Sequence, residues 1–309
     1  MSKPKILIND NDTVTFHQPY LRPMLDRYFD IVNYNPGTEY SAAEYTIMVS
    51  TREFNHTWCT ELLASGAKLV YDAFWEYHVS DRLKKQYPGA HVACCKSYFW
   101  INEYYGNYTC RYNNYAPDKN YTHLALLPIR QSKPHRKQLL TALEPWLSNI
   151  MYSTVDQGRF LPNDQTESQG SFTRYFNPDW YNSTYFSIVS ETVTYSHYNL
   201  HVTEKTFKPM AYYHPFVTFG QCGILAYLHE LGFETFENLF DECYDTEQDQ
   251  PTRLAQIVAN VANFKPQDYN DLTRQKLHHN HNLFYNQARV EKMFVEGIVN
   301  PILEYAQTR

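Results

Sequence analysis

The sequence lacks any long apolar run. No stretch of its 309 residues approaches the roughly eighteen consecutive apolar residues that a membrane-spanning helix needs. The chain begins Met-Ser-Lys-Pro-Lys and passes directly into a short apolar strand pattern, unlike the longer apolar core of a signal peptide. We therefore expect a cytoplasmic protein without a membrane span.

Closely spaced cysteine pairs and an excess of positive charge are also missing. The six cysteines show no CxxC spacing, so we interpret them as reduced packing residues rather than disulfides or zinc ligands. The formal net charge of −6 provides no overall attraction to nucleic-acid phosphates. This weakens an interpretation as a general nucleic-acid binder, while a local basic patch stays open.

Glycine is scarce and tyrosine is abundant, with 10 and 28 residues respectively. Many of the tyrosines cluster in two segments, 98–121 and 175–198. A tyrosine ring stacks on sugars or bases and its hydroxyl forms hydrogen bonds, which would suit a carbohydrate or nucleotide surface. Ordinary core packing explains the same composition equally well, so both interpretations remain open.

The first third of the chain alternates short apolar runs with helical patterns. Strands are predicted at 5–9, 31–34, 45–49, 68–71 and 91–94, and helices at 19–28, 57–65 and 80–86. This alternation is typical of a parallel sheet flanked by helices. The periodicity is lost over 105–120, where turn-forming residues gather. We therefore place an N-terminal, acceptor-side Rossmann-like domain at 1–118.

A second alternation follows. Strands are predicted at 123–127, 149–153, 185–190 and 215–219, and helices at 135–147, from 203, at 223–231, at 251–264 and at 268–293. The polar segment 156–182 is predicted to be a loop that orders over a ligand. We assign 119–280 to a C-terminal, donor-binding Rossmann-like domain and 281–309 to a helix that crosses back to the first domain, with Pro301 ending or kinking it. The expected fold class is α/β.

The most informative segment is Asn199-Leu-His-Val-Thr-Glu-Lys-Thr-Phe-Lys-Pro-Met210. Thr203 is a good N-cap, which places Glu204 and Lys205 in the first helical turn, where free N–H groups and the helix dipole favour an anion. Lys205 would neutralise a diphosphate there, and Glu204 would accept ribose hydroxyls. An acid and a base in a first turn can equally be an ordinary solvated surface.

A second basic residue strengthens the phosphate interpretation. Arg136 stands at the opening of a predicted helix after a strand, where its guanidinium could clamp phosphate oxygens. Both candidate phosphate binders therefore follow strands of one parallel sheet, at the edge where α/β folds bind ligands.

The order of these segments resembles the donor half of the α1,3/α1,4-fucosyltransferases, over roughly residues 122–222. The motifs are Pro134-x-Arg136 with Ala142-Leu143, Tyr185-Phe-Ser-Ile-Val-Ser-Glu191, Val202-Thr-Glu-Lys205 and His214-Pro-Phe-Val-Thr-Phe-Gly220. The stretch Glu204-Lys-Thr-x-Lys-Pro, with His214-Pro-Phe and Leu231-Gly-Phe-x-Thr-Phe236, is also similar to glycosyltransferase-like proteins of phages and marine microbes.

The fucosyltransferase resemblance implies a GT-B fold, in which two Rossmann-like domains face each other across a cleft, and a GDP-fucose donor. It implies that Arg136 and Lys205 hold the diphosphate, that Glu204 holds the ribose and that Glu191 helps to shape the site. Pro209 departs from the family pattern, because it would kink the helix that begins near Thr203. The N-terminal half does not match the acceptor half of that family, so the identity of the sugar stays open.

The resemblance also implies inversion by direct displacement, with a residue of the N-terminal half taking the acceptor proton. Asp72 and Glu76, just after a predicted strand, are our leading candidates, and a surface or capping role is the alternative for each. The other acidic or imidazole side chains near strand ends are Asp10, Asp12 and His17.

We predict no metal and no cofactor beyond the nucleotide-sugar co-substrate. The Asp10-Asn-Asp12 pattern is also common in helix caps, and a GT-B donor site uses positive side chains and helix dipoles instead. The run His278-His-Asn-His281 has no acids or cysteines at ligand spacing, so we interpret it as a polar helix face.

Three hypotheses remain at this stage. The first is an enzyme that transfers a sugar from a nucleotide-sugar donor to a glycan or another hydroxyl acceptor. The second is a phage-type enzyme acting on a hydroxylated DNA base, which the net charge disfavours. The third is a nucleotide-sugar-binding protein without catalysis.

Overall fold

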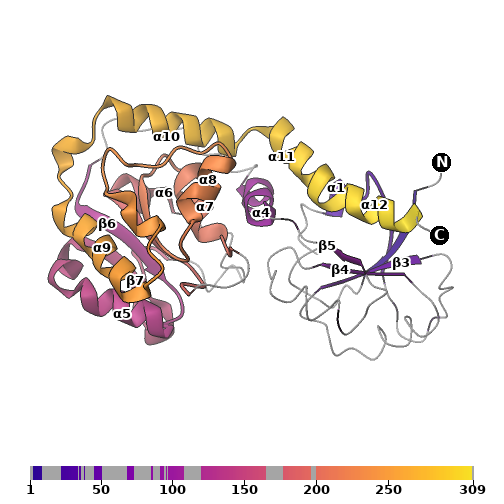
Figure 1. Ribbon diagram of the computed structural model, residues 1–309, viewed down its shortest axis with the longest axis horizontal. Coiled ribbons are helices and arrows are strands. Elements are labelled where there is room, and N and C mark those ends of the chain that lie inside the picture. Colours follow the sequence, from indigo (N-terminus) through magenta and orange to yellow (C-terminus); the bar gives the residue numbers. More distant parts are fainter. Residues whose placement is uncertain are drawn as a thin grey trace. The chain divides into compact units, whose positions relative to one another are not determined.

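The protein comprises two compact units, each built around a parallel sheet. A computed structural model describes residues 3–8, 22–33, 35, 38, 45–50, 68–72, 85, 91–93, 95, 97–107, 120–164, 177–195 and 200–307. The terminal unit consists of Met1–Gly106 with Gln287–Arg309, and the central unit of Asn107–Asn286 (Figure 1). The described chain is therefore an α/β protein with parallel sheets, as the alternation predicts.

The sheet of the terminal unit has the order β2-β1-β3-β4-β5, with every pairing parallel. Its strands are β1 (Lys5–Ile8), β2 (Asp30–Asn33), β3 (Tyr45–Ser50), β4 (Lys68–Asp72) and β5 (His91–Ala93). They coincide with the five predicted strands to within one residue at each end. Chain order runs outward in both directions from β1, so the topological switch lies between β1 and β3.

The helices expected in the terminal unit are described only in part. The pattern at 19–28 contains α1 (Arg22–Leu25), where Pro23 occupies the first turn, a position that tolerates proline. Helices expected at 57–65 and 80–86 lie outside the described residues, apart from Lys85, which is helical. The later part of this unit contains α4 (Tyr98–Asn107), α11 (Gln287–Phe294) and α12 (Asn300–Gln307). Of these, α12 packs against β5.

Pro301 neither ends nor simply kinks the last helix. A π-helical turn, Val295–Val299, separates α11 from α12, and Pro301 is the second residue of α12. Because proline has no N–H group, it cannot complete the α-helical bond to Gly297, and a wider turn accommodates the gap. Gly297 also allows close packing, since a Cβ there would lie 2.7 Å from Cys95 Sγ.

The sheet of the central unit has the order β7-β6-β8-β9, and its pairings are also all parallel. Its strands are β6 (His123–Ile129), β7 (Ile150–Thr154), β8 (Thr184–Ser190) and β9 (Phe216–Phe219). The β8 strand is buried along almost its whole length and β9 throughout, as expected for strands covered on both faces.

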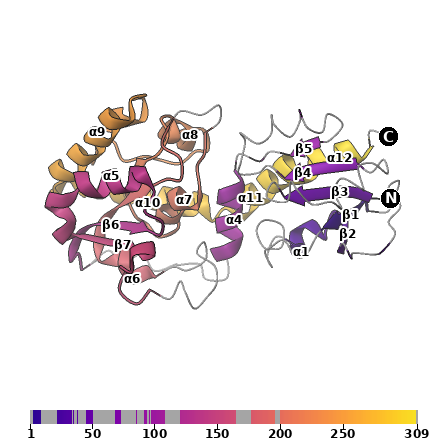
Figure 2. The ribbon, with the colours of Figure 1, turned by 90° about the horizontal axis from the view of Figure 1, so that it is seen from below.

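Helices surround this sheet, and several begin at side-chain caps. In order they are α5 (Pro134–Ala142), α6 (Pro178–Asn182), α7 (Glu204–Ala211), α8 (Ile224–Glu230), α9 (Gln250–Asn263) and α10 (Asp271–Phe284). Thr203 caps α7, Asp249 caps α9 and Asn270 caps α10. The α5 and α9 helices lie side by side, and α10 packs on α7 (Figures 1 and 2).

Two predicted helices are shorter than the sequence pattern indicates. The pattern over 135–147 divides into α5 and a 3₁₀ turn, Glu144–Asn149, because Pro145 interrupts the α-helical bonding. The pattern over 268–293 divides into α10 and α11, with the break at Tyr285 and Asn286. The predicted loop over 156–182 contains α6 near its end, while 165–176 lie outside the described residues. No helix within the described ranges combines the length and apolarity needed to cross a bilayer.

Candidate functional site

The topology of the central sheet locates a candidate ligand-binding edge. Chain order runs outward from β6, to β7 on one side and to β8 and β9 on the other. The connections leaving the carboxyl ends of β6 and β8 therefore diverge, and ligands of open α/β sheets bind at such a switch point. The segments concerned are 130–133 before α5, and 191–203 before α7, described except for 196–199.

The connection after β6 is held by an acidic residue from the end of β7. Asp156 accepts hydrogen bonds from the Ser132 main-chain N–H at 2.7 Å and the Ser132 hydroxyl at 2.8 Å. These bonds lower the pKa of the Asp156 carboxyl. Lys133 follows as the N-cap of α5 with an extended backbone, and Pro134 occupies the first helical turn. The α5 helix therefore begins directly at the switch point.

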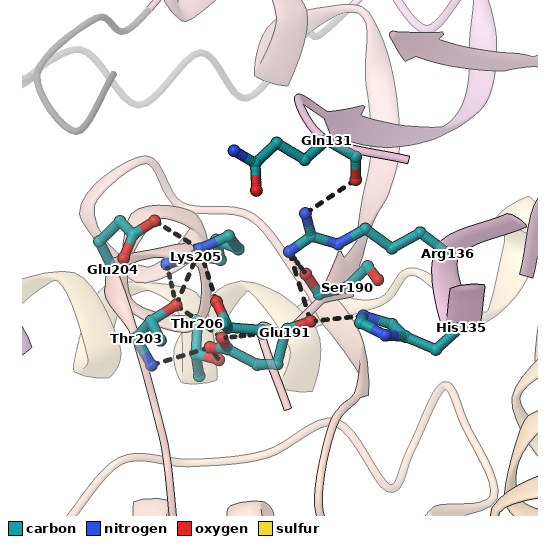
Figure 3. A network of polar contacts seen from close by, with 10 residues as sticks. Gln131, His135, Arg136, Ser190, Glu191, Thr203, Glu204, Lys205 and Thr206 are labelled. Atoms are coloured by element: carbon teal, nitrogen blue, oxygen red, sulfur yellow. Dashed lines mark hydrogen bonds and ion pairs between the residues drawn. The ribbon is translucent and has the colours of Figure 1, made fainter. Parts of the chain in front are cut away.

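The connection after β8 is organised by Glu191, whose side chain is completely buried (Figure 3). Its Oε1 accepts from Thr203 N at 2.9 Å and Thr206 Oγ1 at 2.6 Å. Its Oε2 accepts from Thr203 Oγ1 at 2.6 Å and Thr192 N at 3.1 Å. All four donors are neutral, so the carboxylate joins the first turn of α7 to the end of β8 without pairing with a cation.

Gly220 makes this arrangement possible on the neighbouring strand. A Cβ at that position would lie 3.2 Å from Glu191 Cβ and 2.4 Å from Ile224 Cδ1. A larger residue there would have to move the Ile224 side chain and would press on the buried glutamate. Close packing against Glu191 therefore explains why a glycine follows Phe219.

Arg136 points inward and bonds main-chain carbonyls. Its side chain is only 4% exposed, its Nη1 donates to Gln131 O at 3.1 Å, and its Nη2 donates to Ser190 O at 3.2 Å and Glu191 O at 3.4 Å (Figure 3). Burial lowers the pKa of Arg136 and nearby carboxylates raise it, but an arginine of this kind stays charged. The guanidinium therefore joins the two connections at the switch point.

His135 supports the same junction. Its Nε2 lies 3.0 Å from Glu191 O, the carbonyl that Arg136 also reaches. Burial, followed by the positive charges of Arg136 and Lys133, lowers the pKa of His135 to about 4, although the bond to the Glu191 carbonyl acts in the opposite direction. The ring is thus neutral near pH 7 and donates from Nε2.

Glu204 and Lys205 form an ion pair in the first turn of α7. Lys205 Nζ lies 2.5 Å from Glu204 Oε1, with further bonds to Thr203 Oγ1 at 3.2 Å and Thr192 Oγ1 at 3.4 Å. The side chains of Glu204 and Lys205 are 15% and 29% exposed. Burial favours the neutral acid, but Lys205 and Lys208 outweigh it and lower the pKa of Glu204 to about 2. The pair is therefore ionised and remains accessible to a ligand.

Three cations, Lys133, Arg136 and Lys205, lie close enough at this edge to influence one another. Burial lowers the pKa of Lys133, and the charges of Arg136 and Lys205 lower it further, which means that the three cations share one electrostatic environment. In the described part of the chain, the ammonium of Lys133 has no hydrogen-bond or ion-pair partner. An anion between α5 and α7 would therefore meet two helix N-termini and the ammonium of Lys133.

Metal ligation finds no support at this edge or elsewhere in the residues that the structure describes. No group of three or more histidine, cysteine, aspartate and glutamate side chains is placed to hold an ion there. The histidine run of α10 has packing roles, and the expectation of a purely polar face is wrong for its last member. His281 is buried and stacks on Tyr213 with ring centroids 3.8 Å apart, while His279 Nε2 bonds Gly232 O at 2.7 Å.

The structure brings together all five predicted donor-site residues, which are Arg136, Glu191, Thr203, Glu204 and Lys205. The predicted catalytic residues belong to the other unit. Asp72 is the last residue of β4 and pairs in register with Ser50, whereas Glu76 lies outside the described residues. The further candidates Asp10, Asp12 and His17 also lie outside them.

Lys133, His135 and Thr206 join the site without having been singled out from the sequence. The available signal was their position, because each lies within three residues of a site residue that was identified. A comparison of the chain with protein-family models found no match, and a comparison with curated proteins found none either.

Proposed function

We propose that the protein is a glycosyltransferase that transfers a sugar from a nucleotide-sugar donor of the GDP-fucose type to a glycan or another hydroxyl acceptor. The observation that supports the proposal is the cationic edge formed by Lys133, Arg136 and Lys205, of which Lys133 has no partner among the described residues. A diphosphate is the part of such a donor that suits two helix N-termini and a cationic edge. In this proposal the two units form a GT-B pair of Rossmann-like domains facing across a cleft.

The chemistry would be a direct displacement. The acceptor oxygen attacks the anomeric carbon as the bond from that carbon to the phosphate oxygen breaks, and the electron pair leaves with the nucleoside diphosphate. Lys205 and the N-terminus of α7 stabilise the charge that develops on the leaving group. The acceptor proton passes to a carboxylate of the terminal unit, for which Asp72 and Glu76 remain the candidates, and the anomeric centre inverts.

The remaining residues have distinct roles in this proposal. Glu204 accepts ribose hydroxyls, in line with its low pKa and its partial exposure. Thr203 and Glu191 fix the first turn of α7, on which both Glu204 and Lys205 stand. Because cations and helix dipoles carry the phosphate charge, the proposed reaction needs no metal or other cofactor.

A thermal-shift screen of the purified chain against GDP-, UDP-, CMP- and dTDP-sugars tests donor binding. A ligand at about one hundred times its Kd stabilises the folded protein by about 2.7 kcal/mol, which corresponds to a shift of several degrees. The expected result is a shift with one nucleotide class. No shift with any of them, at concentrations up to several millimolar, would contradict the proposal.

Donor turnover tests the enzymatic part separately. Asp72→Asn and Glu76→Gln should leave the thermal shift unchanged, and loss of the true base should reduce donor hydrolysis or transfer by about a hundredfold or more. Binding with no turnover across a broad acceptor panel would indicate a nucleotide-sugar-binding protein instead. Transfer only to DNA carrying hydroxylated bases, with salt-sensitive DNA retention, would indicate the DNA-directed alternative.

A further inference from the structure

The donors of Arg136 are largely committed within the protein. Both terminal nitrogens of its guanidinium bond carbonyls, namely Gln131 O before α5 and Ser190 O and Glu191 O at the end of β8. These bonds use three of its five N–H donors, and with only 4% of the residue exposed a phosphate has little access to the other two, on Nη1 and Nε. Breaking the three bonds would separate the two connections that form the switch point. The geometry therefore favours a structural task for this arginine.

Lys133 is in the opposite situation. It is half-buried, it stands at the N-cap of α5 with no side-chain cap bond, and its ammonium has no partner in the part of the chain that the structure describes. Arg136 and Lys205 act on it with like charge, and their repulsion adds to the effect of burial in lowering its pKa. An anion bound between Lys133 and Lys205 would relieve that repulsion and compensate the partial charge of the α5 N-terminus.

Two buried polar atoms at the same junction provide an independent observation. Ser190 Oγ and Arg136 Nε have no hydrogen-bond partner among the described residues, although Ser190 and Arg136 are each only 4% exposed. Both residues belong to the network drawn in Figure 3. Buried donors are normally satisfied, and an unsatisfied one commonly indicates a ligand or water. A water held between these atoms and a bound anion would supply the missing acceptors, so that Arg136 does not contact the anion itself.

We propose that Lys133 is the second phosphate-contacting cation of the site, opposite Lys205, and that Arg136 is a positioning residue that holds the two connections together. The proposal rests on the proposed function and changes its assignment of roles. Because the two ammonium groups come from different connections, they suit a ligand with two phosphates better than one with a single phosphate. The site should therefore prefer nucleoside diphosphates to monophosphates, and Lys133 should supply much of that preference.

The test measures the affinity of the full chain for nucleoside diphosphates, nucleoside monophosphates and inorganic pyrophosphate by calorimetry. Lys133→Gln should weaken diphosphate binding about 10- to 100-fold, the usual range for a lost hydrogen bond to a charged group, and monophosphate binding much less. Lys133→Arg should restore most of the affinity. Lys137→Gln is the matched control, because it removes the same charge from an exposed position one turn along α5. It should change affinity less than twofold.

Arg136→Lys should behave differently, with a lower Tm of the unliganded protein and similar losses of affinity for monophosphates and diphosphates. Diphosphate binding by Lys133→Gln within twofold of the unsubstituted protein would overturn the inference and leave the proposed function intact. Pyrophosphate binding that depends on Lys133, without binding of any nucleotide, would sustain the anion site and overturn the proposed function. Absence of binding to every probe would overturn both.

Discussion

The helices that follow β8 and β9 begin at the same edge of one sheet, yet their N-termini are in opposite electrostatic situations. At α8 the protein supplies its own anion, since the Asp245 carboxylate accepts from Leu225 N at 2.9 Å and Ala226 N at 3.1 Å. At α7 the nearby buried carboxylate of Glu191 bonds threonines instead, and Lys205 stands in the first turn. The protein thus supplies a carboxylate to the first N–H groups of α8, whereas at α7 we propose that an external anion binds beside Lys205.

The difference shows that helix N-termini at a ligand-binding edge are not equivalent. A carboxylate aimed at free N–H groups removes both the hydrogen-bonding capacity and the positive potential that would attract a ligand. In the proposed function, the position of acidic side chains therefore decides which connection binds phosphate. Four substitutions or conditions test this contrast, in order of decreasing expected effect.

Glu191→Ala should have the largest effect, because it leaves the buried Thr203 and Thr206 hydroxyls and the Thr203 N–H without their acceptor. We expect the free energy of unfolding to fall by about 3 to 5 kcal/mol, measured by urea denaturation. Thr122→Ala, at a hydroxyl that is exposed and far from α7, is the control and should cost less than about 1 kcal/mol. A loss below about 1 kcal/mol for Glu191→Ala would show that the carboxylate does not organise the site.

Lys205→Ala should weaken nucleoside-diphosphate binding by about 30-fold, because it removes the cation from the open N-terminus. Some loss of stability is also expected, because the mostly buried Glu204 carboxylate loses its closest cation. Calorimetric titration checks the affinity, and thermal unfolding without ligand checks the fold. Unchanged affinity would remove α7 from the binding site.

Asp245→Asn should lower the free energy of unfolding and leave nucleotide affinity unchanged, because it affects the N-terminus of α8. Asparagine has one acceptor oxygen where aspartate has two, so either Leu225 N or Ala226 N loses its partner. The expected cost is about 1 to 2 kcal/mol of unfolding free energy, with nucleotide affinity within twofold of the unsubstituted protein. A marked change in affinity would mean that both N-termini contribute to one ligand site.

The smallest expected effect concerns pH. Because the pKa of Glu204 is lowered from 4.5 to about 2 on folding, its ionised form stabilises the protein above pH 4.5, and this contribution is lost as pH falls toward 2. After allowance for solvent screening, Glu204→Gln should cost about 1 kcal/mol at pH 7 and almost nothing near pH 2. Urea denaturation of the unsubstituted protein and of Glu204→Gln between pH 2 and pH 7 measures this difference in unfolding free energy. A difference that does not change with pH would contradict the ion pair between Glu204 and Lys205.

Local sequence patterns predicted much of the fold. The strands were identifiable because short β-branched runs alternate with helical periodicity, and the start of α7 because Thr203 is a strong N-cap. The divisions within the longer helical patterns were missed. The break between α10 and α11, for instance, falls at Tyr285 and Asn286, which are not strong helix breakers.

The sequence predicted which residues form the site better than it predicted how their side chains lie. Sequence order placed Arg136, Thr203 and Lys205 after strands of one sheet, which parallel pairing brings to one edge. The inward direction of Arg136 depends on carbonyls at Gln131 and Ser190, which become close to each other only in the folded sheet. Lys133 belongs to no recognised motif, and its importance depends on which neighbouring charges are already paired.

The Glu191 junction has a consequence for how specificity can evolve. One carboxylate holds Thr192 at the start of the segment and Thr203 at its end, while Arg253 bonds Thr194 O within it. Both ends are thus fixed to a single point, and closing a longer loop between fixed ends costs little. Residues between these anchors can change in sequence or number while the first turn of α7 stays in place. If the proposed function holds, a new nucleoside or sugar preference can therefore arise in that segment without rebuilding the proposed phosphate site.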